Sequence, residues 1–169
     1  MRKNLLLITI VLCTIGSGLT ASAQTFSNAI AVNDYFVAIT DSLYASGQQW
    51  GRKFNEAYQT KEFSTLVPVR EKMEKMIDGK LQLLAKMKDS FGSENLRLTT
   101  MDFLAFEKKL INEAFIPLEK LNKNSTEAEI QKVMKNLSET AAKETAELDR
   151  VNKAQEAFAS KNGFTIEKE

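Results

Sequence analysis

The sequence contains no histidine, one cysteine and two prolines. Histidine is the commonest general base and metal ligand, so its absence excludes Ser-His triads, His-ligated zinc or haem, and Glu-x-x-His di-iron sites. The chain also has no glycine-rich phosphate loop, no G-x-S-x-G elbow and no calcium loop. We therefore expect no catalytic, cofactor-binding or metal site, and a protein that is not an enzyme.

The first 23 residues are typical of an export leader. Arg2 and Lys3 form a basic start, residues 5–15 are apolar, and Ala-Ser-Ala ends at Ala23. The apolar run is about half of the roughly 20 residues that span a bilayer. We expect a signal peptide over 1–23, cleaved after Ala23, with no transmembrane segment after its removal.

Removal of the leader changes what the remaining chain can do. The only thiol, Cys13, is lost with it, so the exported chain forms no disulfide and holds no iron-sulfur cluster. Leu12 precedes Cys13, whereas bacterial lipoproteins carry a small residue there, so we expect no lipidation. The leader holds two basic residues and no acidic one, which leaves 21 basic against 22 acidic residues. This balance gives no long-range attraction to nucleic acid.

Residues 24–169 have an all-helical pattern. They contain five glycines and two prolines, and apolar residues recur every three or four positions. The spacing predicts helices over about 27–59, 64–90, 100–123 and 126–161. Their connections are short, and short connections pair consecutive helices antiparallel. The predicted fold is an all-α, antiparallel, up-down-up-down four-helix bundle forming a single domain.

Local signals predict where several of these helices begin and end. Capping residues should begin the third and fourth helices, and glycines should end the second and fourth. These residues are Thr99 with Asp102, Thr126 with Glu129, Gly92, and Gly163 followed by Phe164. In the third helix, Pro117 removes the hydrogen bond to the carbonyl of Glu113 and should bend the helix without ending it.

Two glycines stand one turn apart in the first helix. Gly47 and Gly51 each cost about 1 kcal/mol against alanine in a helix interior. They indicate either the close approach of a neighbouring helix, or a flexible joint or gap for a ligand. Trp50 and Tyr58 keep the spacing of the apolar face, so we interpret them as core packing and not as an aromatic binding patch.

Three charged residues fall near the middle of apolar faces: Lys80, Glu107 and Glu144. With a rise of about 1.5 Å per residue, all three lie within roughly one turn along the bundle axis. One interpretation is that one or more turns to the flank and reaches water. The alternative is a buried polar cluster with Lys80 between two glutamates, which sets helix register or contacts a polar ligand.

Two segments carry a family resemblance. The sequence VNDY at 32–35 and the closing AQEAFASKNGF at 154–164 resemble leptospiral-type surface proteins, a group of small exported bacterial proteins of unassigned function. The resemblance covers nearly the whole processed chain and implies a helical, exported protein with no catalytic residue. The Ala-Ser-Ala-Gln junction is similar to leaders common in the Bacteroidetes.

These features favour a non-enzymatic protein of the bacterial envelope, periplasmic or on the cell surface, that binds an unknown envelope or extracellular macromolecule or has a structural role. The sequence leaves open whether the protein forms a homo-oligomer. The alternative is a periplasmic carrier of a small apolar or amphipathic ligand in the bundle core, with Lys80 as its polar contact. A Skp-like helical chaperone ranks last, because such chains are strongly basic and open with a strand.

Overall fold

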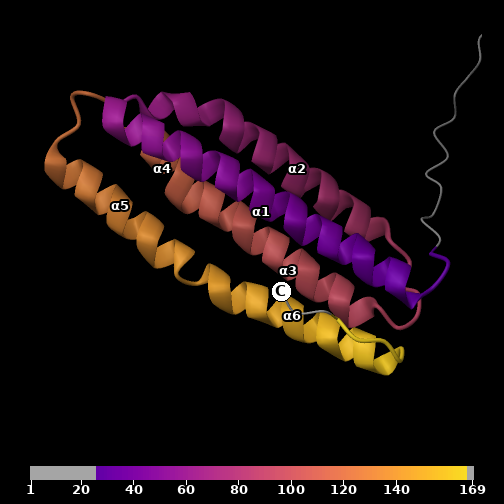
Figure 1. Cartoon of the computed structure of the whole chain (residues 1–169). Helices are drawn as coiled ribbons and strands as arrows, with labels where there is room; N and C mark the ends of the chain where they lie inside the picture. The colour runs from indigo at the N-terminus through magenta and orange to yellow at the C-terminus, as the bar shows by residue number, and fades with distance from the viewer. Residues whose placement is uncertain (1–25, 167–169) are drawn as a thin grey trace, which may run out of the picture.

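Four helical rods pack against one another in the computed structural model, which describes residues 26–166 (Figure 1). The elements are α1 (Ala29–Thr60), η1 (Phe63–Leu66), α2 (Val67–Lys86), α3 (Glu94–Leu110), η2 (Ile111–Phe115), α4 (Ile116–Glu119), α5 (Glu127–Ala141) and α6 (Glu144–Lys161). The second rod joins η1 to α2, the third joins α3, η2 and α4, and the fourth joins α5 to α6. No strand occurs within residues 26–166. The predicted all-α, antiparallel four-helix architecture is confirmed.

One apolar core runs between the rods because each contributes a face at helical spacing. Phe36 and Ile39 of α1, Ile77 of α2, Leu104 of α3 and Val151 of α6 are fully buried. α1 packs against α2, and α3 packs against α6. Within the described residues, no helix is both long enough and apolar enough to cross a bilayer. The predicted signal peptide lies outside the described residues.

The connection between α2 and α3 differs from the prediction at both ends. α2 ends at Lys86 and not near residue 90, because Met87 adopts an extended conformation. Gly92 has the positive φ expected of it, but it belongs to the loop and not to the helix end. α3 begins at Glu94, so the cap predicted at Thr99 is wrong. Burial of Leu96 explains the earlier start, because it adds an apolar contact at the first turn.

Pro117 distorts the third rod without ending it, as predicted. The helix widens into the π-helical segment η2 directly before the proline, and the N–H of Ile116 donates to the carbonyl of Ile111. Proline cannot donate to the carbonyl of Glu113. That carbonyl instead accepts a hydrogen bond from Nδ2 of Asn136 on α5. The distortion therefore gives α5 a polar contact with the third rod.

The fourth rod is not the continuous helix predicted over 126–161. It turns at Ala142 and Lys143, between α5 and α6. α5 packs against η2 and α4, whereas α6 packs against α3, so the turn coincides with a change of packing partner. Leu148 of α6 keeps the helical spacing of the apolar residues but is 38 % exposed. The prediction failed because periodicity cannot show where a helix changes neighbours.

The caps of the fourth rod are confirmed. Thr126 and Glu129 form a reciprocal capping box at the start of α5. At the other end Gly163 has a φ of +74°, and the N–H of Phe164 donates to the carbonyl of Ala159 at 3.1 Å. The ring of Phe164 packs against that of Phe158, with centroids 6.1 Å apart. These local signals needed no knowledge of the tertiary structure.

Candidate functional site

The three charged residues of the apolar faces do not all meet. Glu107 on α3 is only 5 % exposed, and Glu144, the first residue of α6, is half-buried near it. Lys80 on α2 is also half-buried, but its Nζ lies 5.8 Å from the centre of the Tyr35 ring. No ion pair joins Lys80 to either glutamate within the described part of the chain. The structure thus brings the two carboxyl groups together and places Lys80 on the flank, because its long side chain can reach away from the core.

The environment of Glu107 disfavours its charged form. Burial, and secondarily the nearby carboxyl group of Glu144, raise the pKa of Glu107 to about 8. Burial also raises the pKa of Glu144. Oε1 of Glu107 has no hydrogen-bond partner among the described residues. At neutral pH Glu107 is therefore mostly a neutral carboxylic acid with an unused polar atom.

Glu107 and Glu144 both line a cavity of about 470 Å³. Its walls come from α1, α3, η2, α5 and α6, with Met73 contributed by α2. Apolar side chains form most of the lining. Leu43, Leu110, Leu137 and Leu148 are among them. This size and character are typical of small-molecule sites, which run from about 300 to 1,000 Å³.

Gly47 and Gly51 open the α1 side of this cavity. A Cβ placed on either residue would meet no atom within 4 Å, so the expectation that they allow a neighbouring helix to approach closely is wrong. Both residues line the cavity. Their missing side chains leave space beside α1, which agrees with the alternative interpretation of a gap for a ligand.

Trp50 lies between these glycines in the sequence and forms an aromatic wall. Its ring stacks on Phe115 with centroids 3.8 Å apart and on Phe54 at 5.4 Å. Trp50 is 6 % exposed, so the predicted core packing is confirmed, whereas Tyr58 is exposed and was predicted wrongly. Nε1 of Trp50 has no hydrogen-bond partner among the described residues. The indole N–H is thus a second unpaired polar group in the cavity wall.

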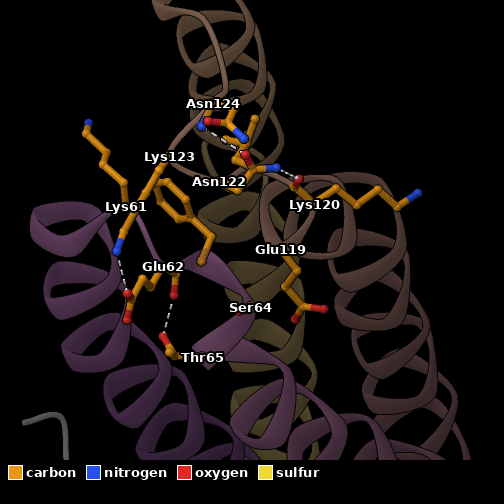
Figure 2. A pocket seen from close by; sticks show the side chains of 11 residues that line it. Lys61, Glu62, Ser64, Thr65, Glu119, Lys120, Asn122, Lys123 and Asn124 are labelled. Carbon is orange, nitrogen blue, oxygen red and sulfur yellow. Dashed lines mark hydrogen bonds and ion pairs between the residues drawn. The ribbon is translucent and has the colours of Figure 1, made fainter.

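A second hollow lies at the end of the bundle where α1 leads into η1 (Figure 2). Polar and charged side chains surround it, and several pair with each other. Lys123 donates to Glu62 at 2.8 Å, and the backbone N–H of Asn124 donates to Asn122 at 2.9 Å. No residue that lines this hollow has a buried side-chain atom without a hydrogen-bond partner. The cavity lined by Glu107 and Trp50 is therefore the stronger candidate site.

Sequence reasoning found part of this site. It singled out Glu107, Glu144 and the glycine pair, but it treated Trp50 as packing alone and chose Lys80 as the polar contact. One feature of the sequence could have indicated the role of Trp50. It lies between Gly47 and Gly51, so a large ring stands next to two residues without side chains. The unpaired indole N–H itself depends on the neighbouring helices and leaves no trace in the sequence.

Comparisons of this chain with models of protein families, with characterised proteins and with solved structures give no match. The resemblance to leptospiral-type surface proteins therefore stays a prediction. The cavity is therefore the feature of the chain that bears on its function.

Proposed function

We propose that the processed chain is an exported, non-enzymatic protein of the bacterial envelope that binds a small amphipathic molecule in the cavity between α1 and α6. The export signal predicted over residues 1–23 supports the location. The cavity itself carries the binding proposal. It combines mostly apolar walls with two buried polar groups, Glu107 and Trp50, that have no protein partner.

These unpaired groups favour ligand binding on energetic grounds. A buried polar group without a hydrogen bond costs about 1–3 kcal/mol, and a ligand that pairs with it, once the side chain turns toward the cavity, recovers part of this cost. The leucine side chains of the wall would bury the apolar part of the same ligand. An amphipathic molecule therefore matches the cavity better than a purely apolar or purely polar one.

The sole tryptophan makes this proposal testable, because Trp50 lies in the cavity wall. Titration with the neutral fluorophore N-phenyl-1-naphthylamine should quench Trp50 emission by energy transfer and saturate at one equivalent. Gly51→Leu should fill the notch and weaken binding at least about tenfold, the loss expected when cavity volume is taken by a side chain. Gly79→Leu is the matched control, since Gly79 is also helical and has no atom within 4 Å of its Cβ position, but it lies outside the cavity.

Equal binding by wild type and Gly51→Leu would show that the fluorophore does not use this cavity. Native mass spectrometry of protein purified from its source provides a second measurement. A stoichiometric small molecule supports the proposal, whereas a clean mass together with a captured protein supports a macromolecular partner.

A macromolecular partner is the second candidate function. Four large apolar side chains, Ile30, Leu83, Phe91 and Leu98, are exposed. They belong to the start of α1, the end of α2, the following loop and the start of α3, which the antiparallel arrangement brings to one end of the bundle. Exposed apolar residues at one end of a bundle are a candidate interaction surface. Ile30→Ser together with Leu98→Ser should then reduce capture of a partner without changing binding of the fluorophore.

A further inference from the structure

We infer that the ligand of the cavity is a small organic cation: an amine, protonated at neutral pH, attached to an apolar body. This inference rests on the proposed function and specifies the class of ligand. It follows from the charges of the lining residues, the unpaired oxygen of Glu107 and the aromatic wall.

The cavity has acidic groups and no basic group to neutralise them. Among residues 26–166, the charged side chains in the lining are Glu107 and Glu144. Two basic residues on the neighbouring helices α3 and α6 pair with other acidic side chains. Lys108 of α3 pairs with Asp78 of α2, and Arg150 of α6 pairs with Glu147 and Asp102. Lys80 of α2 contacts the Tyr35 ring, and α1 contributes no charged residue to the lining. A cation from outside is thus the missing partner of these carboxyl groups.

Binding of an ammonium group would change the protonation of Glu107. In the empty cavity Glu107 holds a proton because its charged form is buried beside another carboxyl group. An ammonium ion supplies the opposite charge, so Glu107 releases its proton to water and accepts a charge-assisted hydrogen bond from the ligand. The balance is one carboxylic acid and one ammonium ion giving one carboxylate–ammonium pair and one free proton.

The apolar walls select the rest of the ligand. Trp50 and Phe115 contribute stacked rings to the lining, and Leu137 and Leu148 contribute hydrocarbon from α5 and α6. Aromatic faces attract cations, and leucine side chains bury hydrocarbon. An anionic ligand of the same size would find no basic side chain in the lining to pair with its charge. The cavity therefore discriminates by charge among molecules of similar shape.

Three probes of similar size test this discrimination: 2-phenylethylamine, 2-phenylethanol and 3-phenylpropanoate. Quenching of Trp50 and isothermal titration calorimetry at pH 7 give their affinities. We expect the amine to bind at least about tenfold more tightly than the alcohol, since hydrogen bonds to charged groups are worth about 1.5–3 kcal/mol. The propanoate should bind more weakly than either.

Proton release shows whether the bound amine forms an ion pair with Glu107 or is only buried in the cavity. Titrations in phosphate and in Tris, which differ in ionisation enthalpy, should show release of close to one proton per amine bound and none for the alcohol. Glu107→Gln should abolish both the proton release and the preference for the amine. Asp34→Asn removes an exposed carboxyl group of α1 outside the cavity and should change neither.

The outcomes separate this inference from the proposed function. If the alcohol binds as tightly as the amine, or Glu107→Gln keeps the preference, the organic-cation inference is wrong while ligand binding stands. The same conclusion follows if only the naphthylamine fluorophore binds. If none of the four probes changes Trp50 emission, both the inference and the proposed function are overturned.

Discussion

Glu107→Gln should make the folded chain less sensitive to alkaline pH. Glutamine has nearly the shape of a protonated glutamate and cannot ionise, so it mimics the neutral form that burial favours. Wild type and variant should then have similar stability near pH 4. As the pH rises, only the wild type must either hold a proton or bury a negative charge.

The magnitude follows from the difference in pKa between the two states. The pKa of Glu107 is about 8 in the folded chain, against an ordinary value of 4.5. Between these values the folded state binds one more proton than the unfolded state, so the free energy of unfolding falls as the pH rises. The fall is about 1.4 kcal/mol per pH unit, which gives about 3 kcal/mol by pH 7 and about 5 kcal/mol by pH 9. The contribution of protonated Glu107 to the free energy of unfolding is fully present below pH 4.5 and is lost as the pH rises to about 8.

Urea denaturation followed by circular dichroism at pH 4, 7 and 9 measures this difference. The advantage of Glu107→Gln over wild type should grow from near zero through about 3 to about 5 kcal/mol. Glu144→Gln should act in the same direction, because burial raises the pKa of Glu144 as well. Parallel pH profiles for wild type and Glu107→Gln would refute the reasoning that burial keeps the carboxyl group of Glu107 protonated.

Other substitutions test the remaining structural statements by thermal or urea denaturation. Gly47→Ala should raise stability by about 1 kcal/mol, because no atom opposes its Cβ, whereas Gly163→Ala should lower it, because φ is +74° there; a gain in both would contradict the cap. Thr126→Ala should cost about 1 kcal/mol by removing the capping box, and no change would mean that the box is not formed in solution. Arg70→Ala should cost about 3 kcal/mol, because it leaves the buried carboxylate of Glu119 unpaired, and the double variant with Glu119→Gln should recover part of the loss.

Local patterns explain why much of the fold was predictable. Helical spacing located α1 to within two residues at its start and one at its end. The capping box of α5 and the glycine cap of α6 depend on neighbours within a few positions, so residue types alone reveal them. The effect of Pro117 was equally local, because the missing N–H belongs to the proline itself.

Predictions failed where an outcome depended on packing between rods. The first turn of α3 forms because Leu96 finds a buried place, and Thr99 then lies inside the helix and not at its cap. The fourth rod turns at Ala142 because its two halves pack on different partners. Lys80 shares its spacing with core residues, yet its side chain extends toward Tyr35. Each of these results depends on which residues of the neighbouring helices a side chain contacts.

The spacing of the apolar residues specifies four amphipathic helices in the described chain, and their short connections specify antiparallel packing, because each apolar face is then buried against its neighbours. The sequence also specifies which side chains are available for chemistry. That Glu107, Glu144 and Trp50 share one cavity depends on how the helices pack. An empty volume, and a buried polar atom without a partner, are properties of the space between helices and not of any single helix.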